Sequence, residues 1–413
     1  MTPRTGTPGD TPGPPKPAPA GSGAPAAVLD GVWEPATDGS GVSPDGGRGE
    51  PAGALPAEVV EDELAGLLGQ AAGLVDAAKA ANTRTAYASD WARFAGWCAD
   101  RELAALPATP ATLGAYLTAA ATDPAAPGYT PATLARWVAA VNFAHRRAGH
   151  PAPGAHPHVG ELLAGIRRSR GRPPARRDAL VTADLRVILA ALPTSGWPAV
   201  VAGRRDAAIL VLGFAGAFRR GELAGLDVAD VRVHRGDGLH VTVRAAKNDP
   251  GRAGQVKAVP YGVEVATCGP CAWARWRAVV TAAEKGGRIA VMRTVLADDR
   301  VTHLCRSPAA EAAGDGVEPA FRALHKTGRI RPGRLSGPAV TKIVQRRAAA
   351  AGYDPTRLGG HSLRAGFVTA AVTAGADAHA IMRQTGHRTP AMIEVYTRHH
   401  APLEANAVTR LGL

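Results

Sequence analysis

The chain of 413 residues lacks the features that would place it in several large classes of protein. Its four cysteines are too few for a disulfide-stabilised secreted domain. No apolar run reaches about 18 residues, the length that a membrane-spanning helix needs. The first residues do not show the basic and then apolar layout of a secretory signal. We therefore expect a cytoplasmic protein with no membrane partner.

Motifs for nucleotide and metal chemistry are also missing. The sequence has no Gly-x-x-x-x-Gly-Lys-Ser/Thr phosphate loop and no group of carboxylates that would hold two metal ions. Four possible zinc ligands do occur: Cys268, Cys271, His303 and Cys305. The Cys-x-x-Cys half suits zinc, but the His-x-Cys half is tighter than the usual ligand pairs of structural zinc sites. We therefore expect no metal and no cofactor.

Acidic residues are outnumbered by basic ones. The chain has 48 Lys and Arg against 35 Asp and Glu, a formal net charge of +13. A nucleic acid is the partner that fits this surplus best, because each neutralised phosphate releases counterions. Charge alone does not separate DNA from RNA or from an anionic membrane surface.

The chain divides into a tail and two domains. Residues 1–55 are rich in Pro and Gly and show no apolar periodicity, so we expect disorder there. Residues 56–170 show helical periodicity, with Gly149 closing one helix and a short helix near 159–166. Helix starts are predicted at N-cap residues, two of them followed by proline: Asn82 or Thr83, Thr109 and Thr130.

A basic segment follows the first domain. Six arginines lie in a stretch broken by Gly and Pro: Arg167, Arg168, Arg170, Arg172, Arg176 and Arg177. It is either a solvated linker, with 171–178 as its centre, or a strap along a phosphate backbone. Arg84 and Arg136 lie on helices that could enter a major groove, or they are plain surface charge.

In the second domain, residues 179–413, the spacing of apolar residues changes once from a helical to an alternating pattern. Apolar residues alternate over 228–246 around a Gly-Asp-Gly turn, which predicts a β-hairpin, and 256–261 adds a third strand. Residues 284–317 show no clear period and are expected to form a surface insertion. Beyond about residue 337 the pattern is helical. The predicted fold class is mostly α with a small antiparallel sheet (α+β).

Three motifs in this domain carry the candidate chemistry. They are Gly216-Ala-Phe-Arg-Arg-Gly-Glu-Leu223, Gly360-His-Ser-Leu-Arg-Ala-Gly366, and Gly386-His-Arg388 with Tyr396 nine residues after the histidine. Taken singly, each has a structural explanation: an i,i+3 ion pair, a solvated helix face, a helix C-cap or a packed aromatic ring. Their combination in this order is much rarer.

Together these residues resemble the signature of the tyrosine recombinase (phage integrase) family: Arg219, His361, Arg364, His387 and Tyr396. The stretch from Ala81 to Trp91 is similar to the opening helix of the family's core-binding domain. The resemblance covers roughly residues 60–400. It implies a helical core-binding domain over 56–170 and an integrase-type catalytic domain over 179–413, which form a C-shaped clamp around double-stranded DNA.

The resemblance also implies roles. Arg219 and Arg364 would hold the nonbridging oxygens of a phosphodiester, because a guanidinium pairs with phosphate bidentately and stays charged. Tyr396 would be the nucleophile that forms a 3′-phosphotyrosine and releases a 5′-hydroxyl. His361 would be the general base or a donor that positions the phosphate, and His387 would donate to a nonbridging oxygen.

The general acid is expected at Lys247, in the turn that follows the hairpin, where the family places a catalytic lysine. Lys257 is its nearest rival, although it lies in a strand-like run.

By the same resemblance the working assembly is a homo-tetramer on two DNA sites, associated with the nucleoid. Two other functions stay open: a type IB topoisomerase-like relaxing enzyme, and a DNA-binding protein that has lost catalysis. Helix packing of the C-terminal residues on the same chain or on a neighbouring protomer also stays open.

Overall fold

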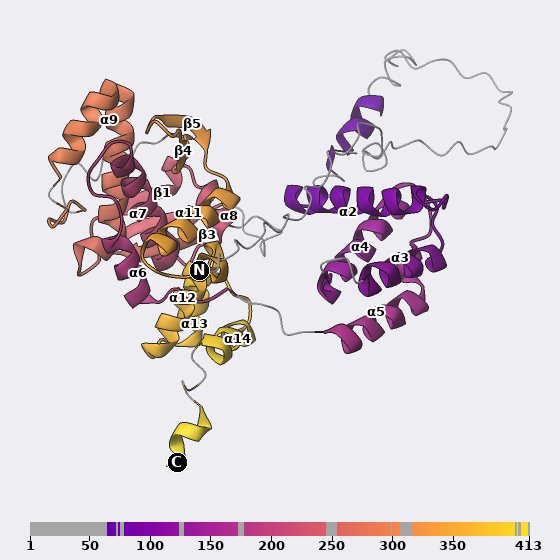
Figure 1. The fold of residues 1–413 in the computed structure, drawn as a ribbon. Helices are drawn as coiled ribbons and strands as arrows, with labels where there is room; N and C mark the ends of the chain where they lie inside the picture. Colours follow the sequence, from indigo (N-terminus) through magenta and orange to yellow (C-terminus); the bar gives the residue numbers. More distant parts are fainter. Residues whose placement is uncertain are drawn as a thin grey trace, which may run out of the picture. The chain divides into compact units, whose positions relative to one another are not determined.

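The structure of the protein is a computed structural model. It describes residues 64–71, 73–74, 78–123, 128–171, 177–244, 254–298, 300–305, 316–400, 403 and 406–411. The tail predicted over 1–55 lies outside these residues. The chain separates into two compact units, Met1–Pro174 and Ala175–Leu413 (Figure 1). Each unit is described by itself below.

The first unit is a bundle of helices packed around aromatic side chains. The helices that form its core are α2 (Ala81–Ala99), α3 (Pro110–Thr122), α4 (Pro131–Arg147) and α5 (Pro157–Arg170), and residues 64–71 are helical as well. The buried rings of Trp91, Phe94, Tyr116 and Trp137 join α2, α3 and α4, with ring centroids 5.2 Å apart for Phe94 and Tyr116. Such rings bury large apolar areas, which is how four short helices reach a stable core.

The predicted helix starts are confirmed at two of three places. The hydroxyls of Thr109 and Thr130 accept hydrogen bonds from the backbone N–H three residues on, with proline in the first helical turn. The third prediction is wrong, because α2 begins at Ala81, after an N-cap Ala80 that offers no side-chain acceptor. Gly149 lies just beyond α4 with φ of +71°, the left-handed conformation that favours glycine after a helix.

The predicted basic strap is in part a helix. α5 continues to Arg170, so Arg167, Arg168 and Arg170 form its last turn, where cations stabilise the negative end of the helix dipole. All three side chains are exposed. Arg172 lies outside the described residues.

The second unit is built around the buried helix α7 (Ala199–Ala215). Among the described residues, the further helices of this unit are α6 (Thr182–Ala190), α8 (Arg220–Gly225), α9 (Gly269–Leu296), α11 (Gly337–Ala350), α12 (Gly360–Thr373), α13 (Ala378–Thr385) and α14 (Pro390–His400). Short 3-10 turns also occur in this unit: η3 (Val228–Asp230), η4 (Val265–Thr267), η5 (Pro355–Arg357) and η6 (Ala407–Arg410), while η2 (Pro153–Ala155) lies between α4 and α5 of the first unit. The expectation of helices beyond residue 337 is confirmed.

The sheet follows the prediction. β1 (Val231–His234), β2 (Gly238–Val243) and β3 (Gln255–Pro260) pair antiparallel in that order, so the hairpin and the third strand are confirmed. A second pair, β4 (Arg322–Leu324) and β5 (Ile330–Arg334), was not predicted. The fold class is therefore mostly helical with small antiparallel sheets, as expected.

The surface insertion predicted over 284–317 is wrong for its first part. Residues 284–296 belong to α9, which is kinked where Gly286 and Gly287 leave helical backbone angles. Two adjacent glycines have low helix propensity, and they interrupt the apolar period that would have marked one long helix. Residues 306–315 lie outside the described part of the chain.

No helix among the described residues is long and apolar enough to cross a membrane.

Gly366 of α12 provides a test of this packing. A Cβ on Gly366 would lie 1.7 Å from the backbone oxygen of Leu180, whose N–H donates to the carbonyl of Ser362. We predict that Gly366→Ala lowers the free energy of unfolding by about 3 kcal/mol or more, because backbone must move to admit the methyl group.

The matched control is Gly221→Ala in α8, where a Cβ meets nothing within 4 Å. This change should leave stability unchanged or raise it by up to about 1 kcal/mol, since alanine is the better helix former. Chemical denaturation measures the free energy of unfolding of both variants. Equal values for the two would contradict the close packing of Gly366 against Leu180.

Candidate active site

The side chains of Tyr396 and His361 meet in the second unit. Tyr396 extends from α14, and its hydroxyl lies 2.8 Å from Nε2 of His361 at the start of α12. The ring of His387 also lies near the phenol, with its centroid 5.6 Å from that of Tyr396. The phenol therefore has an imidazole nitrogen within proton-transfer distance.

Three cations and one carboxylate lie beside this pair, around residues 216–222. Glu222 is buried and accepts from Arg219 at 2.5 Å and from Nζ of Lys257 at 3.3 Å. Nη1 of Arg364 donates to the carbonyl of Ala217 at 2.7 Å, and Lys257 donates to the same carbonyl at 3.3 Å. Ala217 has φ of +47°, a strained conformation for alanine that turns this carbonyl toward both cations.

Arg364 is buried more deeply than an unpaired guanidinium normally is, with 1% of its surface exposed. Its Nη2 atom has no hydrogen-bond partner within the described part of the chain. Burial lowers the pKa of Arg364, and the neighbouring charge of Arg219 lowers it further. A buried donor without an acceptor is costly, so this nitrogen indicates a place for an anion.

His387 is held neutral by its surroundings. Burial lowers its pKa to about 3, and the charges of Arg364 and Arg219 act in the same direction. The single proton of the Thr385 hydroxyl is donated to the carbonyl of Ile381, 2.8 Å away. Nδ1 of His387, 3.0 Å from the same hydroxyl, is therefore the donor in that contact, which leaves Nε2 unprotonated. His387 would donate to a phosphate oxygen only after taking up a second proton, which a bound anion favours.

Two glutamines fasten α13, and with it His387, to the rest of the unit. Gln384 donates to the carbonyls of Ala215 and Ala258, both at 2.7 Å, and Gln255 of β3 donates to the carbonyl of Arg383 at 2.6 Å. These bonds tie α13 to the end of α7 and to the sheet. The loop that carries His387 is thus fixed by backbone acceptors.

Comparison with known proteins agrees with this arrangement. The sequence model of the phage integrase family matches residues 321–402, which include His361, Arg364, His387 and Tyr396. An integrase/recombinase xerD homolog of Selenomonas ruminantium is 29% identical over 340 residues, 82% of this chain and 87% of the relative. These similarities support the tyrosine recombinase (phage integrase) resemblance that the sequence motifs predicted.

A second relative matches a smaller part of the chain. The tyrosine recombinase XerD of Xanthomonas axonopodis pv. citri is 28% identical over 225 residues, 54% of this chain and 59% of the relative. Among solved structures, a lambda integrase dimer bound to a COC′ core site is similar with a TM-score of 0.45 and 16% identity, over 79% of this chain and 74% of that one. A likeness of that size establishes no function.

The two candidate lysines differ in what the structure shows. Lys247 lies outside the described residues. Lys257 is fully buried, and its three ammonium protons face the carbonyls of Gly216 and Ala217 and the carboxylate of Glu222. Burial lowers the pKa of Lys257 to about 8. With every proton engaged, Lys257 holds the 216–222 segment in place.

Glu222, Thr385 and Gln384 also belong to the site, although the sequence motifs did not predict them as site residues. Glu222 forms the i,i+3 ion pair that was considered as a purely structural explanation, and that pair is itself part of the site. The sequence did contain a signal that Lys257 is buried. Lys257 lies two residues before Val259, so both side chains are on the buried face of β3. A lysine in the core-facing phase of a strand must find charged or carbonyl partners.

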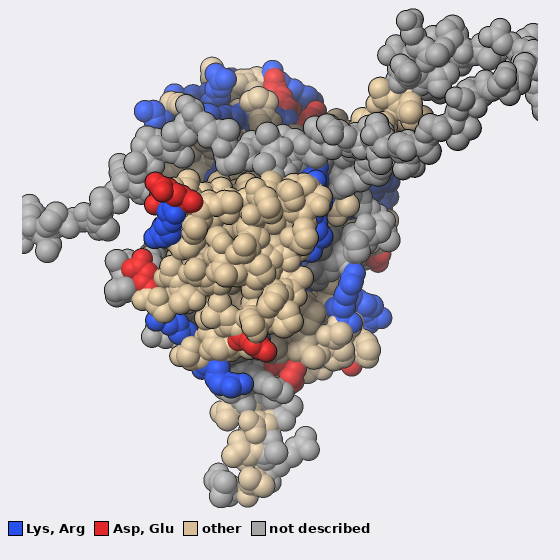
Figure 2. Space-filling model, turned by 90° about the vertical axis from the view of Figure 1, so that its right-hand side faces the viewer, with Lys and Arg blue, Asp and Glu red and all other residues tan. Residues whose placement is uncertain are grey.

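The candidate DNA-contacting arginines of the first unit differ from one another. Arg84 is exposed on α2, whereas Arg136 forms a two-point ion pair with the buried carboxylate of Asp90, at 2.7 and 3.0 Å. The face of the molecule in Figure 2 has a broad centre without Lys, Arg, Asp or Glu, with both basic and acidic side chains at its margins. An uncharged surface of this kind is a poor match for a phosphate backbone.

The four possible zinc ligands, which were expected to hold no metal, lie together in the structure: Cys268, Cys271, His303 and Cys305. They are considered below.

The buried His387 predicts how stability depends on pH. Its pKa in the folded state, about 3, is below the ordinary value of about 6.5. The contribution to stability is therefore complete above pH 6.5 and is lost as the pH falls toward 3, by up to about 2 kcal/mol at pH 5. We predict that His387→Asn reduces the fall in melting temperature between pH 7.5 and pH 5.

His379→Asn is the matched control, since His379 is an exposed histidine of α13. This variant should show the same fall in melting temperature between pH 7.5 and pH 5 as the unmodified chain. Scanning calorimetry of the three proteins is the measurement, and an unchanged slope in His387→Asn would show that folding does not lower the pKa of His387.

Proposed function

We propose that this chain is a site-specific DNA recombinase that cleaves and rejoins strands through a 3′-phosphotyrosine at Tyr396. The observation that carries the proposal is the hydrogen bond of 2.8 Å between the Tyr396 hydroxyl and His361, beside the unpartnered Nη2 of Arg364. A nucleophile with a base thus lies next to a buried donor for an anion.

The charge of the site favours a phosphodiester. Among the described residues around 216–222, Arg219, Lys257 and Arg364 contribute three positive charges against the single carboxylate of Glu222. Preorganised positive charge stabilises the charge that builds on the nonbridging oxygens when a phosphodiester is attacked. Arg219 and Arg364 would hold these oxygens, and a protonated His387 would add a third donor.

A tyrosine suits a reaction in which the broken bond is remade. The phenol has a pKa near 10, well below that of an aliphatic hydroxyl, so it leaves readily when the 5′-hydroxyl attacks the phosphotyrosine. Its proton would pass to His361. Because the covalent intermediate conserves the energy of the phosphodiester, strand exchange by this route needs no nucleotide hydrolysis, and none of these roles needs a metal.

The general acid that protonates the leaving 5′ oxygen would be Lys247. Lys257 is the rival for this role, and its hydrogen bonds to the carbonyls of Gly216 and Ala217 and to Glu222 favour Lys247 over it. DNA would be held partly by exposed arginines of the first unit: Arg84, Arg167, Arg168 and Arg170. That the two units close around a duplex, and that four protomers act on two DNA sites, stay predictions.

The nucleophile is tested by trapping. Sites bound in cells are first mapped by genome-wide immunoprecipitation, and duplexes carrying such a site are nicked beside the cleavage position so that religation fails. We predict a covalent protein–DNA adduct with the unmodified chain and none with Tyr396→Phe, because the phenylalanine ring has no oxygen to attack phosphorus. Denaturing gels after protease treatment are the measurement.

Tyr353→Phe is the control, since Tyr353 is a tyrosine of the same unit whose hydroxyl donates to Asp184; it should form the adduct. No adduct from any variant would favour a DNA-binding protein without catalysis. An adduct together with relaxation of a supercoiled plasmid that carries no target site, and no recombination of two sites, would favour a topoisomerase.

The role of Lys247 is tested with a leaving group that needs no acid. We predict that Lys247→Ala lowers the cleavage rate by about 10²-fold or more on ordinary DNA. On DNA with sulfur in place of the bridging 5′ oxygen the rate should recover, because a thiolate leaves without protonation. Lys257→Met should slow both substrates alike, since its effect is on the position of Arg219 and Ala217. Equal rescue of the two variants would overturn this assignment.

A further inference from the structure

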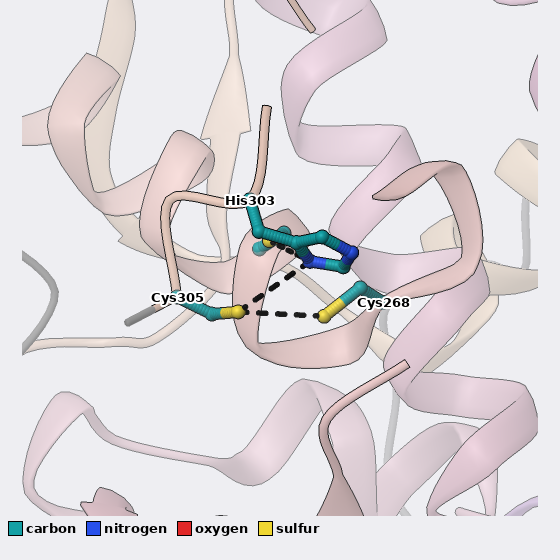
Figure 3. A group of neighbouring side chains, drawn as sticks. Cys268, His303 and Cys305 are labelled. Atoms are coloured by element: carbon teal, nitrogen blue, oxygen red, sulfur yellow. Dashed lines mark hydrogen bonds between the residues drawn. The ribbon is translucent and has the colours of Figure 1, made fainter. Parts of the chain in front are cut away.

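Three thiols and an imidazole meet at the start of α9. Cys268 and Cys271 lie at the N-terminus of that helix, and His303 and Cys305 lie in the segment that follows it. One ligand atom from each residue lies within 4.8 Å of all the others. Figure 3 shows His303, Cys305 and Cys268 turned toward a common point.

The spacing of these atoms fits a tetrahedral zinc ion. Bonds of about 2.3 Å to sulfur and 2.0–2.1 Å to nitrogen place two sulfurs about 3.75 Å apart, and a sulfur and a nitrogen about 3.5 Å apart. The observed separations are 3.8 Å between Sγ of Cys268 and Cys305, and 3.4 and 3.6 Å from Nδ1 of His303 to Sγ of Cys271 and Cys305. An iron–sulfur cluster would hold its thiolates farther apart.

The protein also supplies the surroundings that a structural zinc site needs. The three cysteines are at most 2% exposed. Nε2 of His303 lies 3.2 Å from the carbonyl of Val263, and a proton donated there leaves the lone pair of Nδ1 directed at the thiols. The N–H of Gly262 donates to Sγ of Cys268 at 3.3 Å, a bond that stabilises a thiolate.

The kink in α9 makes this meeting possible. A straight helix from Gly269 to Leu296 would be about 40 Å long, while the seven residues from Leu296 to His303 span at most about 25 Å. The reversal at Gly286 and Gly287 brings the chain back. Arg275 then holds the returning segment, donating to the carbonyl of Thr302 at 2.9 Å.

We propose that Cys268, Cys271, His303 and Cys305 bind one structural zinc ion that joins the start of α9 to the segment after it. All four ligands come from the protein and three are buried, so the site is closed, as structural zinc sites are, and has no open position for a substrate. The sequence pointed to the same four residues, but the tight His-x-Cys spacing led to the expectation of no metal. The zinc site is separate from the residues proposed for DNA cleavage, and the inference does not rest on them.

The test measures metal in the full-length chain, purified under reducing conditions without a metal-affinity column. We expect about one zinc per chain by plasma mass spectrometry. Cys271→Ser and Cys305→Ser should lose it, and Cys98→Ser, which changes the remaining cysteine in the core of the first unit, should keep it. Replacement of zinc by Co²⁺ in the unmodified chain should give the intense visible bands of a tetrahedral thiolate site.

Two variants of His303 distinguish a role as metal ligand from a role in packing alone. His303→Cys should keep the metal and strengthen the sulfur-to-cobalt charge-transfer band, whereas His303→Ala should weaken metal binding. If the serine variants fail to fold, the metal content and cobalt spectrum of the unmodified chain still decide. Zinc well below one equivalent with no cobalt bands from the reduced protein, or a Cys268–Cys305 disulfide in protein taken directly from cells, would overturn the proposal.

Discussion

The site depends on one buried carboxylate. Glu222 is the single acid among Arg219, Lys257 and Arg364, and it contacts the first two directly. Its pKa is lowered: burial alone would raise it, and the charge of Lys257 and the hydrogen bonds from Arg219 outweigh that effect. Without this anion, three cations would repel one another in a medium that solvates them poorly. With it, the cluster keeps a positive surplus, which is what a phosphate requires.

That constraint explains why the site combines residues from distant parts of the chain. Arg219 and Glu222 come from the start of α8, Lys257 from a strand, and Arg364 from α12. Arg219 and Glu222 pair locally at i,i+3, but Lys257 and Arg364 have their partners only when the other elements are in place. Assembly of the fold and assembly of the charge cluster are therefore the same event, and the site is preorganised before any substrate arrives.

The sequence predicted what local patterns encode. The caps at Thr109 and Thr130 and the three-stranded sheet follow from side-chain chemistry within a few residues. The five signature residues were found through resemblance, and the structure brings Tyr396 against His361. Local patterns could not show that the ammonium group of Lys257 donates to carbonyls about 40 residues away in the sequence. Nor could they show that α9 turns back at Gly286 and Gly287, which brings His303 against Cys271. Both depend on contacts between elements far apart in sequence.

Much of the framework behind the site is held by main-chain carbonyls. Arg364, Lys257 and the two glutamines all donate to peptide oxygens, at Gly216, Ala217, Ala215, Ala258 and Arg383. A peptide oxygen is present whatever side chain its residue carries. Substitutions at these accepting positions can therefore accumulate without removing an acceptor, provided that the backbone keeps its path, whereas the donors have no such freedom. An enzyme built in this way can diverge widely in sequence while the positions of its reacting groups stay the same.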